Sequence, residues 1–270
     1  MPEFKRYSLL TDLMVELAPE IEAAQKASAS LDQDEIHPVQ PALSAILSEF
    51  APLPREALFL GVAALDGLPV LLNLMDPVPG PILIVGDAGS GKTAFLQMIA
   101  SGVEQIHEPQ DVQYGVITAH LDDWKNLGGT PNCVDVFPSY KNSAQDFLNS
   151  LASWAHSNRG EKQSLLLLID DLAEITKMDF EARQSLRWLL LRGPARHVWP
   201  IVTLNPRNIN DILPWTEFFH TRLFGRMKDS QDIQSMTGTQ DSLFTSLIPR
   251  LEFLMREGRQ WLKFWIPSLD

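Results

Sequence analysis

Continuous apolar runs alternate along this chain with stretches in which apolar residues recur at helical spacing. The continuous runs predict buried strands over 81–85, 113–119, 132–137, 164–169 and 197–204. The periodic stretches predict amphipathic helices over 94–106, 143–158 and 180–192. Because strands and helices alternate, the pattern predicts an α/β fold with a mostly parallel central sheet flanked by helices.

The first 53 residues follow a different pattern. Apolar residues at helical spacing over 8–29 predict a helix that Pro19 kinks or splits. An acidic segment over 31–41 predicts a linker, and a second short helix is expected over 41–50. We therefore expect a helical N-terminal extension with its linker over residues 1–53, and the core domain over residues 54–270.

Two further segments complete the expected core. Asp66-Gly67 lies between two short apolar runs, which is typical of a β-hairpin. Near the other end, Glu257-Gly258 turns the chain into a final strand over 259–266. Trp261, Phe264 and Trp265 on this strand are expected to pack in a core or a subunit interface, with base stacking as the alternative.

The most informative motif follows the first predicted parallel strand. Gly86-Asp87-Ala88-Gly89-Ser90-Gly91-Lys92-Thr93 matches G-x-x-x-x-G-K-[ST], the phosphate-binding loop of P-loop NTPases. Glycines allow the backbone to bend around phosphates, and consecutive N–H groups with the helix N-terminus attract the anion. We expect all eight residues to bind the nucleotide, Lys92 to reach its β- and γ-phosphates, and the Thr93 hydroxyl to bind Mg²⁺.

A second motif ends the strand over 164–169. Asp170-Asp171 follows this apolar run, as in the Walker B pattern, where the carboxylate holds Mg²⁺ opposite the P-loop hydroxyl. Asp170 is therefore expected to bind the metal together with Thr93. Asp171 is expected to orient or deprotonate the attacking water.

Residues after the next strand supply candidates for contacts with the γ-phosphate. Asn205 is the first candidate and Thr203 the second, although an Asn-Pro turn that merely ends the strand is an equal alternative. Residues 208–211 read Asn-Ile-Asn-Asp, which lacks the lysine of the guanine-reading N-K-x-D motif, so adenine is favoured over guanine. Arg192 and Arg196 are candidates for an arginine finger acting across a subunit boundary.

Composition narrows the setting of the protein. The net charge is −12, and the acidic excess lies before Leu172, since the later residues carry 13 Lys+Arg against 11 Asp+Glu. Nucleic acid would therefore have to bind at a local patch. The single cysteine, the lack of an apolar run long enough to span a membrane and the lack of a signal-peptide core lead us to expect a cytoplasmic protein.

Several motifs together resemble the motor domain of the FtsK/SpoIIIE/HerA family. The hairpin around Asp66-Gly67-Leu68-Pro69-Val70 before the P-loop is similar to the family's "LGxDxxGxPV" segment. Asp170-Asp171-Leu172-Ala173-Glu174 resembles its "DEFADL", and Thr221-Arg222-Leu223 resembles the start of its "TRIxFxV". The resemblance covers approximately residues 55–266 and implies a RecA-like P-loop NTPase fold.

This resemblance also implies a function. Proteins of this family bind ATP and Mg²⁺ between subunits of a ring, so it implies a homo-oligomer, with a hexamer as the expected form, that moves double-stranded DNA. The sequence departs from the family at Asp171, where the family has a catalytic glutamate. The alternative is a slow, non-motor ATP-dependent switch or assembly protein that recruits a protein partner through residues 1–53.

Overall fold

The computed structural model describes residues 40–158 and 163–269. These residues belong to one compact unit that begins at Gln40. The helix predicted over 8–29 lies outside the described residues, as does nearly all of the linker predicted over 31–41. The side chains of residues 208–211 lie outside the description as well, so the base-recognition hypothesis at this segment stays a prediction.

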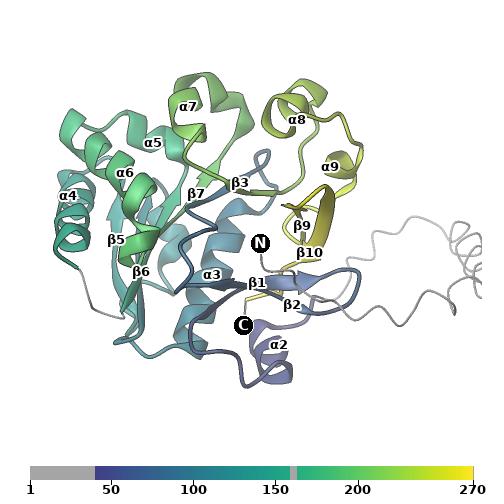
Figure 1. The fold of residues 1–270 in the computed structure, drawn as a ribbon, viewed down its shortest axis with the longest axis horizontal. Coiled ribbons are helices and arrows are strands. Elements are labelled where there is room, and N and C mark those ends of the chain that lie inside the picture. The colour runs from purple at the N-terminus through teal and green to yellow at the C-terminus, as the bar shows by residue number, and fades with distance from the viewer. Residues whose placement is uncertain (1–39, 159–162, 270) are drawn as a thin grey trace, which may run out of the picture. The chain divides into compact units, whose positions relative to one another are not determined.

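Within the described residues, ten strands form a single sheet in the order β2-β1-β10-β9-β8-β3-β7-β6-β4-β5 (Figure 1). The strands are β1 (Ala57–Ala63), β2 (Pro69–Asn73), β3 (Ile82–Val85), β4 (Val112–Thr118), β5 (Cys133–Pro138), β6 (Ser164–Asp170), β7 (Val198–Leu204), β8 (Thr221–Phe224), β9 (Glu252–Glu257) and β10 (Gln260–Trp265). The helices are α2 (Leu43–Glu49), α3 (Lys92–Ile106), α4 (Asn142–Ser157), α5 (Leu172–Thr176), α6 (Phe180–Arg192), α7 (Ile209–Thr216), α8 (Ser230–Thr237) and α9 (Leu243–Ser246). Short 3₁₀ turns occur over η1 (Leu121–Trp124), η2 (Pro194–Arg196) and η3 (Pro206–Asn208).

The sheet has a parallel part and an antiparallel part. Strands β8, β3, β7, β6, β4 and β5 run parallel, whereas β9, β10, β1 and β2 are joined by antiparallel pairs. Parallel strands need long crossover connections, and helices such as α3 and α4 supply them here. The mostly parallel α/β sheet predicted from the sequence is therefore confirmed, together with flanking helices close to their expected bounds.

Alternating side chains of the buried strands pack against different helices. In β3, Ile82 and Ile84 join a core that includes α3, whereas Leu83 and Val85 join a second core formed with α4, α5 and α6. This arrangement follows from the period of two along a strand. It explains why the strand carries no polar residue, since both of its faces are covered.

The antiparallel part contains the predicted hairpin and one unexpected strand. Strands β1 and β2 pair on either side of Asp66-Gly67, as the sequence predicted. Strand β9 was not expected, and it pairs with β8 and β10. Helix α2, which the sequence analysis placed in the N-terminal extension, packs on the core: Leu43 is fully buried and its N–H donates to the Ser268 carbonyl.

Aromatic residues of β10 pack inside the fold. Phe264 is fully buried with its ring centroid 5.9 Å from that of Phe95, and Trp261 makes edge-to-face contacts with Phe224 and Phe244. The packing alternative is thus confirmed for these two side chains. None of the helices in residues 40–158 and 163–269 combines the length and apolarity needed to cross a bilayer.

Candidate functional site

The predicted site residues come from the carboxyl ends of three neighbouring parallel strands. Strand β3 leads into the P-loop, β6 ends at Asp170, and β7 lies between them and carries Thr203. The registers pair Ile84 with Thr203 and Ile169 with Val202, so these ends meet at one edge of the sheet. Ligands of open α/β sheets bind at this edge.

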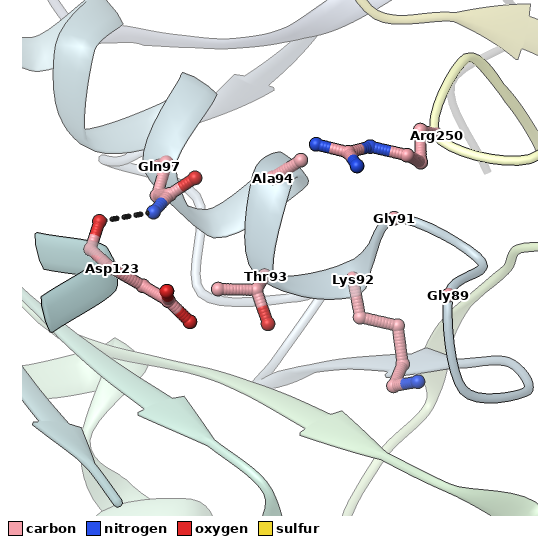
Figure 2. A pocket seen from close by; sticks show the side chains of 8 residues that line it. All are labelled: Gly89, Gly91, Lys92, Thr93, Ala94, Gln97, Asp123 and Arg250. Carbon is pink, nitrogen blue, oxygen red and sulfur yellow. Dashed lines mark hydrogen bonds between the residues drawn. The ribbon is translucent and has the colours of Figure 1, made fainter. Parts of the chain in front are cut away.

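The P-loop spans the turn between β3 and α3. Gly91 has a φ of +102°, a value that residues with a side chain rarely adopt. The Lys92 ammonium donates hydrogen bonds to the carbonyls of Gly86 and Asp87, at 2.8 and 2.9 Å. Burial lowers the pKa of Lys92, while Asp170, Asp171 and Asp87 act in the opposite direction. Lys92 is thus a partly buried cation at the mouth of the loop. Figure 2 shows its side chain beside that of Thr93.

Asp170 joins the P-loop to the neighbouring strands through two hydroxyl groups. Thr93 Oγ1 donates to the Asp170 carboxylate, with 3.1 Å to each oxygen, and Thr203 Oγ1 donates to Oδ1 at 3.1 Å. Asp170 is nearly buried, and burial raises the pKa of its carboxyl against the opposing effect of these hydrogen bonds and of Lys92. The structure therefore brings together the two residues expected to hold Mg²⁺.

Asp171 adopts an uncommon backbone conformation, with φ 81° and ψ 106°. Its N–H donates to Thr203 Oγ1 at 2.8 Å, and its carboxylate accepts the N–H of Ala173 at 3.0 Å. The carboxylate therefore caps the short helix α5. It also lies near enough to Lys92 to influence that residue's pKa. Its expected role with the attacking water stays a prediction.

The candidates for the γ-phosphate contact differ in their surroundings. Asn205 is partly exposed, and its side-chain oxygen accepts the Arg207 N–H at 3.2 Å, as in an Asx turn. Thr203 is fully buried and bonded to Asp170 at the end of β6 and to Asp171, which follows that strand. Thr203, the second candidate, is therefore the one that the fold ties directly to Asp170 and Asp171.

The arginine-finger candidates lie away from this edge. Arg192 ends α6, and Arg196 lies in the turn just before β7, at the amino end of that strand. Arg196 donates to the Asn158 carbonyl at 3.2 Å. Neither residue joins the site of its own chain. A role across a subunit boundary stays a prediction.

Several residues around the P-loop were not singled out from the sequence. The Arg226 carbonyl accepts the Asp87 N–H at 3.0 Å, and the Lys228 N–H donates to the Asp87 carboxylate at 2.9 Å. The Arg250 N–H donates to the Ser90 carbonyl at 2.8 Å. Segments after β8 and before β9 thus fix both sides of the loop. Their basic composition was the only signal available in the sequence.

Chemical fit supports a nucleotide with its metal at this site. Thr93 and Asp170 provide the oxygen ligands that Mg²⁺ prefers, and Lys92 provides the cation that phosphates need. The Ser90 hydroxyl is buried in the loop and has no hydrogen-bond partner within the described residues. An anion bound in the loop would give these groups charged or hydrogen-bonding partners.

Thr203→Val tests the hydroxyl that joins Asp170 to Asp171. The valine leaves the partly buried Asp171 N–H without its acceptor, which costs about 1 kcal/mol of unfolding free energy. It also removes a hydrogen bond that orients Asp170, the expected metal ligand, so NTP turnover should fall about 10–100-fold. Chemical denaturation and steady-state phosphate release measure the two effects. Thr203→Ser keeps the hydroxyl and should keep most of both properties; equal losses in the two variants would contradict the assignment.

Comparisons with solved structures show the same fold in several ATPases. EccC (ATPases 2 and 3) from Thermomonospora curvata, solved with a signal sequence peptide, aligns with a TM-score of 0.63 and 15% identity over 86% of this chain and 43% of that chain. EssC (ATPases 2 and 3) from Geobacillus thermodenitrificans aligns with a TM-score of 0.66 and 15% identity, over 81% of this chain and 48% of that chain. The DNA-packaging ATPase B204 from Sulfolobus Turreted Icosahedral Virus aligns with a TM-score of 0.51 and 10% identity, over 71% of this chain and 98% of that chain.

These similarities establish the fold, and the chain spans less than half of the EccC and EssC chains. No curated protein sequence matches the chain. The profile of the NACHT domain matches residues 80–233, which is more than half of the chain and includes both the P-loop and Asp170-Asp171. The chain therefore belongs to the NACHT-domain family and is a P-loop NTPase.

Proposed function

We propose that this NTPase binds and hydrolyses ATP with Mg²⁺ and works as a ring-forming motor of the FtsK/HerA type, a DNA translocase or pump. The observation that carries the catalytic part of this proposal is the contact between Thr93 and both oxygens of Asp170, beside the partly buried Lys92. It unites a phosphate loop and a Mg²⁺ carboxylate at the carboxyl edge of one parallel sheet.

Each site residue has a role in the proposed reaction. The backbone of 86–93 and Lys92 hold the phosphates, and Thr93 with Asp170 holds Mg²⁺, which supplies charge stabilisation when bound. Asp171 positions the attacking water, and Asn205 senses the γ-phosphate. Asp171 is one methylene shorter than the glutamate of FtsK-type motors, and its carboxylate caps α5, so release of the Ala173 N–H accompanies this role.

The motor part of the proposal rests on sequence resemblance and on the fold. Motifs over approximately residues 55–266 resemble the FtsK/SpoIIIE/HerA family, and the fold aligns with secretion ATPases and with a DNA-packaging ATPase. A homo-oligomeric ring, with a hexamer as the expected form, would place ATP between subunits. The DNA would then have to meet a local basic patch, because the chain as a whole is acidic.

A second candidate is a slow ATP-dependent switch that recruits a protein partner through residues 1–53. Two observations favour it: the Asp171 carboxylate is engaged as a helix cap, and the matching family profile is that of the NACHT domain. Such a protein would bind ATP through the same loop but would hydrolyse it slowly. The cytoplasmic location expected from the sequence stays a prediction for both candidates.

Steady-state ATPase activity with and without duplex DNA separates the two candidates. A motor should bind DNA at low salt and hydrolyse ATP at least several-fold faster in its presence, because the DNA contacts are electrostatic and couple to turnover. Lys92→Ala, assayed in parallel with DNA, controls for contaminating ATPases. If DNA neither binds at low salt nor stimulates turnover, the motor proposal is wrong, and slow hydrolysis with tight ATP binding then supports the switch.

A further inference from the structure

A cavity of about 380 Å³ opens beside the first turn of α3. Its walls include Gly91 and Ala94 at the start of the helix, Gln97 one turn later, Asp123 from η1, and Arg250 from the segment before β9. Figure 2 shows the Lys92 and Thr93 side chains pointing to one side of this first turn, with Gln97 and Arg250 on the other side. Lys92 and Thr93 of the P-loop also line the cavity, so it adjoins the phosphate site and extends from there to Arg250.

The backbone of Arg250 is held directly against the P-loop. Its N–H donates to the Ser90 carbonyl at 2.8 Å. A Cβ atom at Gly91 would lie only 2.4 Å from Arg250 Cα, so the close approach requires glycine at that position. Arg250 itself has a φ of +65°, a conformation that costs a non-glycine residue stability and often marks a functional position.

The guanidinium of Arg250 has no ion-pair or hydrogen-bond partner within residues 40–158 and 163–269. Figure 2 shows it extending over Ala94, at the N-terminal turn of α3. Two sources of positive potential therefore converge on one place, the guanidinium and the helix N-terminus. The part of a ligand that lies beside Arg250 should therefore be an anion. A base is disfavoured there, because none of the residues lining the cavity is aromatic and none could stack on the base.

We propose that Arg250 binds the α-phosphate of the nucleotide held by the P-loop of the same chain. The inference rests on the proposed nucleotide site, where Lys92 reaches the β- and γ-phosphates. A phosphate chain that begins at Lys92 and passes the helix N-terminus brings its α-phosphate beneath the Arg250 guanidinium. The segment that carries Arg250 leads into β9, so this contact would link the antiparallel part of the sheet to the bound nucleotide.

Titration of the full-length protein with Mg²⁺-ATP and Mg²⁺-ADP tests this contact. Arg250→Ala should weaken both nucleotides about tenfold, because both carry the α-phosphate and the interaction is charge-assisted. Arg250→Lys keeps the charge and should lose less affinity. Arg259→Ala, which removes an exposed arginine from the turn between β9 and β10, is the matched control and should bind both nucleotides like the wild type.

Each other outcome overturns the assignment. A loss confined to ATP would place Arg250 at the γ-phosphate, and unchanged affinities for ATP and ADP would remove it from the site. Arg250→Gly also lacks the guanidinium but relieves the positive φ, so a defect that Arg250→Ala has and Arg250→Gly lacks would be a backbone effect. Wild-type protein that binds no ATP would refute the proposed function itself, whereas wild-type binding with a fully competent Arg250→Ala refutes this inference alone.

Discussion

Lys92→Ala should reduce ATP turnover at least 100-fold, one of the two largest losses expected from a single substitution in this chain. The Lys92 ammonium is the positive charge at the mouth of the P-loop, and in this structure it is partly buried and bonded to the carbonyls of Gly86 and Asp87. Burial keeps water from replacing it, so alanine leaves charge on the transferred phosphoryl group without compensation. Loss of one such preorganised contact typically costs 10²–10³-fold in rate.

The measurement is steady-state phosphate release, together with ATP affinity by titration. Lys177→Ala is the matched control, because this exposed lysine forms its salt bridge with Glu174, three residues earlier, outside the P-loop, and it should leave turnover unchanged. Wild-type turnover in Lys92→Ala would refute the assignment of the P-loop as the catalytic site.

Asp170→Asn should lower ATP turnover and raise the stability of the nucleotide-free protein. The amide cannot supply the carboxylate that Mg²⁺ prefers, so Mg²⁺-dependent turnover should fall at least 100-fold. The nucleotide-free protein should nevertheless become more stable. Burial raises the pKa of Asp170, which means that the folded state disfavours its charged form. The amide oxygen can still accept from Thr93 and Thr203, and Lys92 keeps its two carbonyl partners.

The pH dependence gives the sign of this effect. Because the folded-state pKa of Asp170 lies above its unfolded value, the folded protein binds more protons between the two values. The unfolding free energy contributed by this group therefore falls as pH rises from the usual carboxyl range through the raised pKa. Thermal unfolding without nucleotide should show little difference between wild type and Asp170→Asn at pH 4 and a higher melting temperature for the variant at pH 8.

Two controls test whether these effects come from the buried Asp170 carboxylate. Asp123→Asn changes an exposed carboxylate near the same cavity and should show no such rise in melting temperature with pH. Excess Mg²⁺ with ATP should reverse the order of stabilities, since ligand binding to the folded state adds more stability to the wild type, which keeps the carboxylate expected to hold Mg²⁺. A variant that is less stable than the wild type at pH 8 would contradict the burial argument, and unchanged Mg²⁺-dependent turnover would contradict the metal role.

Much of the fold could be predicted because its signals are local. The apolar run before Gly86 and the periodic stretch after Thr93 identify a strand and a helix within about 25 residues, and Asp66-Gly67 identifies a hairpin in the same way. Strand β9 escaped prediction since its residues alternate imperfectly: Phe253 and Leu254 are both buried, while Glu257 is exposed. Its place in the sheet depends on pairing with β10, which follows after a short turn, and with β8, which lies far earlier in the chain; no local pattern reveals this pairing.

By itself, the sequence determined the P-loop motif and predicted which groups would bind the nucleotide and its metal: the glycines of the loop, Lys92, Thr93 and the paired carboxylates after an apolar strand. These groups directly follow predicted strands in the sequence. Because the carboxyl ends of parallel strands lie at one edge of the sheet, the groups could be expected to meet there. Only the tertiary structure decided how these groups are used. It joins Thr203 to both Asp170 and Asp171, turns the Asp171 carboxylate into a helix cap, and brings Arg250 from 157 residues beyond Thr93 to the same helix turn. Those contacts arise from packing between distant segments, whose partners depend on the assembled sheet and leave no pattern along the chain.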